Sequence, residues 1–261
     1  MNGLRVVVLI GLGIAASGCI NSASVITIKP NGSGTIEQTM LVNMAALKGL
    51  MAGMGGQAKQ SGGVLNEAEF KRAAERMGVR PVSLTPLTEG GFEGAKAVYA
   101  FDDITTVRVD QDPQPAGPSA SASSRSPIKF GLARQGATSV LTITVDEQAA
   151  DSATARAQDA PSLDTIDPAM MQMIKTMFDG FRILIDVEVD GTIVKTNADY
   201  VTGSRITLLE VDMAGVFADE AKLKTLQSKV RPGASISELR PYLKDIKGVK
   251  VNHPSITIEY R

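Results

Sequence analysis

Few side chains in this sequence have the type and spacing that nucleophilic or acid–base catalysis requires. His253 is the only histidine, so a serine–histidine–acid triad would depend on it. No G-x-S-x-G motif supplies the exposed serine that such a triad needs. Because His253 stands between Asn252 and Pro254, just before a predicted strand, we interpret it as a polar turn residue.

Two groups of carboxylates are the other candidates for catalysis, Asp102 with Asp103 and Asp164 with Asp167. Paired acids hydrolyse glycosides when their carboxyl groups face each other across the substrate. Adjacent residues of a strand point to opposite faces, and acids in loops are usually solvated. We therefore expect Asp102 and Asp103 to end a strand and cap the turn at Ile104, and we predict no catalytic residue. A hydrolase that uses paired carboxylates is the alternative hypothesis.

Metal-binding side chains are also few. One histidine and one cysteine exclude the usual zinc sites. Methionine is the residue type in excess, with 11 in the chain and no tryptophan. Three interpretations of these methionines stay open: flexible thioethers that fill an aromatic-poor core, a deformable apolar surface for a lipid-like ligand or a partner, and a Cu(I) site without histidine. We predict neither a metal ion nor a cofactor.

One methionine cluster has helical spacing. A helix is predicted to begin at Asp167-Pro168 and to run to Phe178, because proline suits the first turn. The residues at the spacing of one apolar stripe within it are Met170, Met173, Ile174 and Met177. We take this stripe as the candidate surface for a lipid-like ligand or a protein partner.

The N-terminal residues have the pattern of a cleaved signal peptide. Arg5 supplies a positive charge, residues 6–16 are apolar, and the small residues Ser17 and Gly18 precede the only cysteine, Cys19. A membrane-spanning helix needs about 20 apolar residues, and this run is too short. Residues 1–18 are therefore predicted to be removed on export.

The cleavage region Ala16-Ser17-Gly18-Cys19 resembles the lipobox of bacterial prolipoproteins. That resemblance implies that Cys19 becomes the mature N-terminus and carries a diacylglycerol, often with a third acyl chain on its amine. The partner it implies is membrane lipid, in the bacterial cell envelope, either on the outer membrane facing the periplasm or on the outer face of the plasma membrane. An ordinary signal peptide with an incidental cysteine is the alternative.

The distribution of charge adds a second link to membranes. A formal net charge of −1 gives no electrostatic case for binding nucleic acid. Residues 221–261 nevertheless contain nine lysines and arginines against three acids. We interpret this segment as a solvated helix face, which near a bilayer would also be attracted to anionic headgroups. No disulfide can form in the mature chain, because its single cysteine is Cys19.

The elements predicted after the anchor alternate between hairpins and helices. Strands are predicted at 25–29, 35–42, 82–84, 97–101, 128–133, 140–145, 181–189, 192–196, 206–211 and 255–260, and helices at 44–54, 67–77, 168–178, 213–228 and 235–247. Asp190-Gly191 is predicted to join the strands on either side of it as a hairpin. The fold class is therefore α+β, with an antiparallel sheet built from hairpins and helices packed on one face.

The predicted domain organisation holds the domain close to the membrane. Residues 25–261 form one α+β envelope domain, with mobile loops at about 110–126 and 147–162, where apolar residues are few. Residues 19–24 are expected to be a short lipid-attached tether, in which the five residues 20–24 reach at most about 20 Å. We therefore expect the edge that bears Val25 to face the lipid headgroups.

Two segments carry a wider resemblance. Residues 26–36, Ile-Thr-Ile-Lys-Pro-Asn-Gly-Ser-Gly-Thr-Ile, and residues 91–104, Gly-Phe-Glu-Gly-Ala-Lys-Ala-Val-Tyr-Ala-Phe-Asp-Asp-Ile, look like uncharacterised bacterial lipoproteins and are loosely similar to the LppM-type domain. Those proteins usually have Asp where this turn has Asn31. The resemblance implies an α+β envelope domain and transfers no activity. We predict a non-enzymatic, membrane-anchored envelope lipoprotein that binds a lipid-like ligand or an envelope protein.

Overall fold

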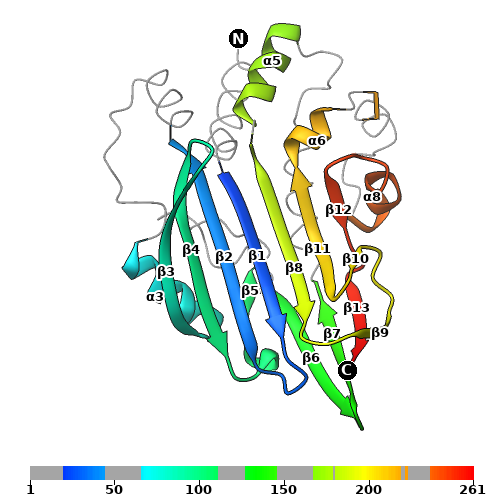
Figure 1. Cartoon of the computed structure of the whole chain (residues 1–261). Helices are drawn as coiled ribbons and strands as arrows, with labels where there is room; N and C mark the ends of the chain where they lie inside the picture. The colour runs from blue at the N-terminus through cyan, green and yellow to red at the C-terminus, as the bar shows by residue number, and fades with distance from the viewer. Residues whose placement is uncertain are drawn as a thin grey trace, which may run out of the picture.

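The structure is a computed structural model that describes residues 20–44, 66–110, 127–145, 167–178, 180–218, 221–222 and 236–261 (Figure 1). The predicted helix at 44–54 and both predicted mobile loops fall almost wholly outside them.

The larger of two sheets contains eight described strands in the order β10-β11-β8-β1-β2-β4-β3, with β12 paired to β11. Their bounds are β1 (Ile20–Ile28), β2 (Gly34–Asn43), β3 (Arg80–Glu89), β4 (Phe92–Phe101), β8 (Arg182–Val189), β10 (Val201–Thr202), β11 (Arg205–Asp212) and β12 (Val249–Val251). At the centre, β1 pairs antiparallel with β2 and parallel with β8. The sheet is therefore mixed, whereas a purely antiparallel sheet was predicted.

The second sheet has the order β5-β6-β7-β13-β9 and lies behind the main sheet in Figure 1. Its strands are β5 (Val109–Asp110), β6 (Pro127–Gln135), β7 (Thr138–Thr144), β9 (Ile193–Thr196) and β13 (Ser255–Tyr260). Within the described residues, the helices whose bounds are complete are α3 (Glu67–Met77), α5 (Pro168–Met177), α6 (Met213–Phe217) and α8 (Ile236–Leu243), and Ile104–Thr106 forms the 3₁₀ turn η1.

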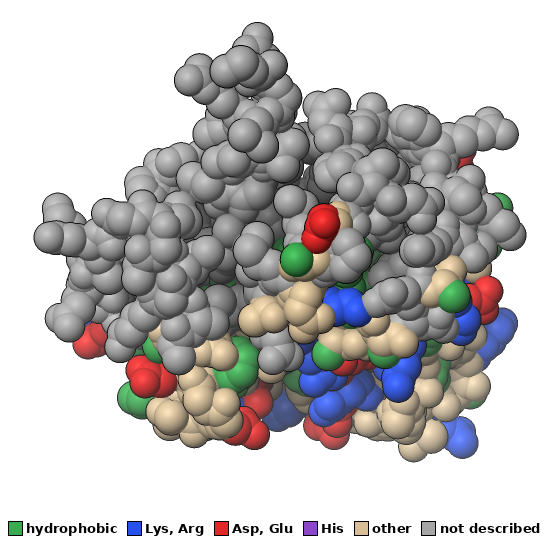
Figure 2. All heavy atoms as spheres, turned by 90° about the horizontal axis from the view of Figure 1, so that it is seen from above, with side chains coloured by type: hydrophobic (Ala, Val, Ile, Leu, Met, Phe, Trp, Pro, Cys, Tyr) green, Lys and Arg blue, Asp and Glu red, His purple; other side chains and the backbone are tan. Residues whose placement is uncertain are grey.

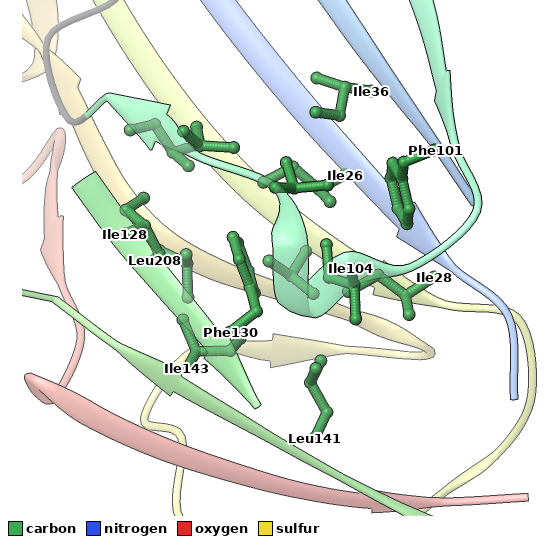
Figure 3. Close-up of a cluster of buried hydrophobic side chains, with 14 of the residues drawn as sticks. Ile26, Ile28, Ile36, Phe101, Ile104, Ile128, Phe130, Leu141, Ile143 and Leu208 are labelled. Atoms are coloured by element: carbon green, nitrogen blue, oxygen red, sulfur yellow. The ribbon is translucent and has the colours of Figure 1, made fainter. Parts of the chain in front are cut away.

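The hydrophobic core lies between the two sheets. Ile26 and Ile36 of the main sheet point towards Phe130 and Leu141 of the second sheet (Figure 3). Helix α3 closes part of the same core, with Phe70 stacked at 5.0 Å from the ring of Tyr99. The α+β prediction is thus only loosely supported, because a second sheet covers most of the face that helices were expected to cover.

Local signals in the sequence predicted several elements well. The hairpins β1–β2, β3–β4 and β6–β7 are present where alternation and turn residues indicated them. In the first turn, the side chain of Asn31 accepts from the N–H of Ser33 at 3.0 Å, and Gly32 has a φ of 88°. Asn66 caps α3 and Gly78 ends it in the left-handed conformation, so the helix has the bounds 67–77 that were predicted.

The predicted hairpin at Asp190-Gly191 is wrong. β8 pairs with β1 and β11 in the main sheet, whereas β9 pairs with β13 in the second sheet. Asp190 donates its N–H to the carbonyl of Ile28, and Thr192 then exchanges two hydrogen bonds with Arg261. Asp190 and Gly191 therefore connect a strand of the main sheet to a strand of the second sheet. The same two residue types also form hairpin turns, so the local sequence does not distinguish the two kinds of connection.

Candidate functional site

The first described residue after Cys19 already belongs to the main sheet. Ile20 opens β1 and pairs with Val42 of β2, and Asn21 pairs with both Leu41 and Arg182. Residues 20–24 are therefore the first half of a central strand, rather than the tether we expected. Val25, which we placed at the edge, lies within the strand.

We call the end of the main sheet at Ile20 the anchor end. The registers bring four further strand termini to it: Asn43 at the end of β2, Phe92 at the start of β4, Arg182 at the start of β8 and Asp212 at the end of β11. In Figure 1 this is the upper end of the sheet, where α5 and α6 also lie. Cys19 itself is outside the described residues.

Phenylalanines gather at the anchor end. The ring of Phe178 lies 6.0 Å from that of Phe181, edge to face, and 6.3 Å from that of Phe217. The carbonyl of Phe181 accepts from the N–H of Met213 at 3.1 Å, which joins the start of β8 to the start of α6. The ring of Phe92 packs directly on Gly180. Because β1 and β2 separate β8 from β4, this contact brings the start of β8 and the start of β4 together across the anchor end.

A second feature is a network of charged side chains on the face of the main sheet that points away from the second sheet. Glu210 binds Arg182 at 2.8 Å and Lys250 at 2.7 Å. Arg205 binds Glu188 at 2.6 Å and lies 3.8 Å from Asp186. Figure 2 shows the molecule from above, looking down on the anchor end. The outer face of the main sheet lies along the lower edge of that picture, where basic and acidic side chains are found together.

Asp186 is the buried member of this network. It is only 3% exposed, and its Oδ1 has no hydrogen-bond partner among the described residues. Burial raises the pKa of Asp186, and the hydrogen bond with Thr207 and the charge of Arg205 oppose that shift. Burial acts in the same direction on Glu210, but its hydrogen bonds with Lys250 and Arg182 outweigh it and lower the pKa of Glu210. The basic side chains of the sheet already neutralise these carboxylates, so we assign the network a structural role.

The structure does not test the predicted methionine stripe. The helix is present as α5, and it leads directly into Phe178 and the anchor end. The side chains of Met170, Met173, Ile174 and Met177 lie outside what the structure describes, so the stripe stays a prediction. Met40 and Met77 are buried, each 7% exposed, which agrees with the core-filling interpretation for these two residues.

The acids considered for catalysis have other partners where they are described. Asp102 pairs with Arg80 at 3.0 Å. Asp103 accepts from the N–H of Thr105 and caps η1, as predicted, and that hydrogen bond lowers the pKa of Asp103. Asp167 caps α5 by accepting from the N–H of Ala169 at 2.7 Å. Asp164 lies outside the described residues.

His253 lies in the turn before β13, as its neighbours indicated. Its Nε2 is 3.3 Å from a carboxylate oxygen of Asp199, which also binds Lys244 at 2.8 Å. The side chain of Asn252 holds the turn by accepting from the N–H groups of Asp199 and His253. Across the described part of the chain, no group of three or more histidine, cysteine or acidic side chains could hold a metal ion. No described helix is long and apolar enough to cross a membrane.

Comparisons with known proteins give one structural similarity. No protein-family model matches the chain, and no curated protein matches it. Among solved structures, the chain is similar to the NMR structure of the folded domain of the Mycobacterium tuberculosis LppM protein, with 12% identity over 93% of this chain and 90% of that one and a TM-score of 0.34. The backbones superpose only in part at that score.

Proposed function

We propose that this chain is a lipid-anchored domain of the bacterial cell envelope, in which acylated Cys19 holds the anchor end of the main sheet against a membrane. The apolar surface near that end binds a lipid-like molecule or an envelope protein. The observation that carries the proposal is the start of β1 at Ile20, because it leaves no free chain between the modified residue and the folded sheet.

Two properties of the sequence support the anchor. The apolar run at 6–16 is too short to span a bilayer, and small residues precede Cys19. Two or three acyl chains, at about 0.8 kcal/mol per buried methylene, hold a protein on a membrane durably, whereas one chain does so only marginally. In a domain attached in this way, the anchor end would stay at the membrane.

The ligand surface proposed is the methionine stripe of α5. Met170, Met173, Ile174 and Met177 share one side of this helix by their spacing, and unbranched thioethers adapt to irregular apolar ligands. The helix is joined to β8 through Phe178, so a bound lipid would lie close to the bilayer that supplies it.

The experiment that tests the anchor compares the whole precursor with its Cys19→Ser variant in a bacterial host supplied with an alkyne-tagged fatty acid. We expect the natural chain to take up the tag and to sediment with membranes, and the variant to do neither. A natural chain that is exported but untagged would contradict the proposal.

A separate experiment tests the ligand. Lipids that purify with the detergent-extracted protein are identified by mass spectrometry, for the natural chain and for Met173→Gln. Lys71→Gln, on the exposed side of α3, is the matched control. We expect a lipid beyond the anchor in the natural chain and in the control, and its loss in Met173→Gln. Retention of the lipid in all three would exclude the stripe as the surface that binds it.

A further inference from the structure

The seven phenylalanines of the chain divide into two groups. Phe70, Phe101 and Phe130 are buried in the core between the sheets. The other four, at positions 92, 178, 181 and 217, belong to no part of that core in the described residues, and each is half-buried. All four lie at the anchor end, although they come from segments that are far apart in the sequence.

The opposite end of the main sheet has a different character. Its turns are polar, with Asn31 after β1, Asp102 after β4 and Asp190 after β8, and all three side chains are exposed. The half-buried phenylalanine rings are thus confined to one end of the strand axis, whereas Phe101, at the opposite end of β4, is buried in the core.

We infer that Phe92, Phe178, Phe181 and Phe217 form a membrane-contacting surface that lies in the interfacial layer of the bilayer beside the acylated Cys19. This inference rests on the proposed function, since acylation of Cys19 is what brings the anchor end to the membrane. The occupant is the bilayer because the residue that precedes Ile20 is the one that carries the lipid. One residue spans at most about 3.6 Å, so the acyl chains must enter the bilayer next to these rings.

The contacts among the rings suit this role. Phe181 is fixed to Met213 through a backbone hydrogen bond, and Phe178 touches the rings of both Phe181 and Phe217. The cluster therefore connects β8 to α6 as a preordered patch. A preordered apolar patch gains more from contact with lipid than separate flexible side chains do, because less conformational entropy is lost.

Photocrosslinking in the natural, full-length precursor tests the inference. A photoreactive phenylalanine analogue replaces Phe217, and in a matched control it replaces Val201, which is 41% exposed and lies beside the opposite end of β11. Cells are irradiated, and adducts on the purified protein are identified by mass spectrometry. Anchoring at Cys19 is measured on the same samples by membrane sedimentation and fatty-acid tagging.

We expect phospholipid adducts at Phe217 and few or none at Val201, because an aromatic ring in the interfacial layer lies at the level of the headgroups and a water-exposed side chain does not. Because the analogue keeps an aromatic ring at residue 217, the fold is retained, and an unchanged melting temperature checks this. Adducts with protein alone at Phe217, or equal lipid adducts at both positions, would overturn the inference. If the chain is anchored and Phe217 gives no lipid adduct, the membrane-contacting surface is wrong and the anchor stands. If the chain is not acylated, both fail.

Discussion

The ring of Phe92 lies so close to the α-carbon of Gly180 that a β-carbon at residue 180 would overlap it. This contact joins the start of β4 to the start of β8 across the anchor end, and Gly180 also has a φ of 78°, which other residues adopt only with strain. The glycine is therefore needed for its backbone conformation, and an added β-carbon would also force the Phe92 ring to move.

Gly180→Ala should lower the free energy of unfolding by about 2–4 kcal/mol, because it adds a steric overlap to the strain of a positive φ. Gly136→Ala is the control: Gly136 has a φ of 64°, but nothing lies within 4 Å of its added β-carbon, so about 1 kcal/mol is expected. Urea unfolding of the two variants measures the difference. Equal losses would show that Phe92 does not fix the start of β8.

Two buried tyrosines should respond in opposite ways to loss of the hydroxyl group. Tyr260 donates to the carbonyl of Lys29 at 3.1 Å and so ties the second sheet to the first hairpin. The hydroxyl of Tyr99 is buried with no hydrogen-bond partner among the described residues, and burial raises the pKa of Tyr99 to about 12. Tyr260→Phe should therefore cost about 1 kcal/mol of stability, whereas Tyr99→Phe should be neutral or stabilising. Thermal unfolding distinguishes the two, and a larger loss in Tyr99→Phe would mean that its hydroxyl has a partner.

Asp186 should make stability fall as pH rises. Burial raises its pKa above the ordinary value of 3.8, so between that value and the native pKa the folded state binds more protons than the unfolded state. The free energy of unfolding contributed by this residue therefore declines with rising pH across that window and is constant above it. Asp186→Asn should abolish this decline, which urea unfolding between about pH 4 and pH 7 would measure.

Asp199 is the control, because its contribution to the free energy of unfolding changes with pH in the opposite direction to that of Asp186. The hydrogen bond from Lys244 lowers the pKa of Asp199, so its contribution is lost as pH falls through the native pKa, below 3.8. Asp199→Asn should leave the decline due to Asp186 intact. If Asp186→Asn has the same pH profile as the natural chain, the carboxyl group of Asp186 is not the source of that decline.

A flexible insert tests whether Cys19 only attaches the protein to the membrane or also holds the anchor end against the bilayer. Ten Gly/Ser residues between Cys19 and Ile20 would add a tether of about 17 Å without touching β1. We expect the melting temperature to stay unchanged and lipid adducts at Phe217 to disappear. The same insert between Ser22 and Ala23 should unfold the domain, because both residues pair with β2 and β8. If the variant with the insert between Cys19 and Ile20 keeps its lipid adducts at Phe217, the short connection to Cys19 is not what brings Phe217 to the bilayer.

Much of the local structure could be predicted from the sequence, and the long-range pairing could not. Turn residues and alternation identified three hairpins, and capping residues identified the ends of α3. The parallel pairing of β1 with β8 joins residues about 160 positions apart, as in Ser24 with Ile185, and no local pattern encodes it. The crossing at Asp190-Gly191 was missed for the same reason.

The first half of β1 illustrates the limit most clearly. Residues 20–24 contain Asn21, Ser22 and Ser24 and lack the apolar alternation of a strand, so the sequence suggested a tether. Ser22 and Ser24 are nevertheless only 3% exposed each, because alternation places them on the same face of β1 as Ile26 and Ile28 of the core. The phenylalanine cluster was also missed, since its members have no periodicity and meet only through the tertiary fold.

The most direct test of the central claim is the mass of the N-terminal peptide of the mature protein, isolated from bacterial membranes. If the main sheet is held at the membrane through its first residue, the chain begins at Cys19 and carries the added mass of a diacylglycerol on the sulfur, with or without a further acyl chain on the amine. A mature chain that begins elsewhere, or that begins at an unmodified Cys19, would contradict the claim.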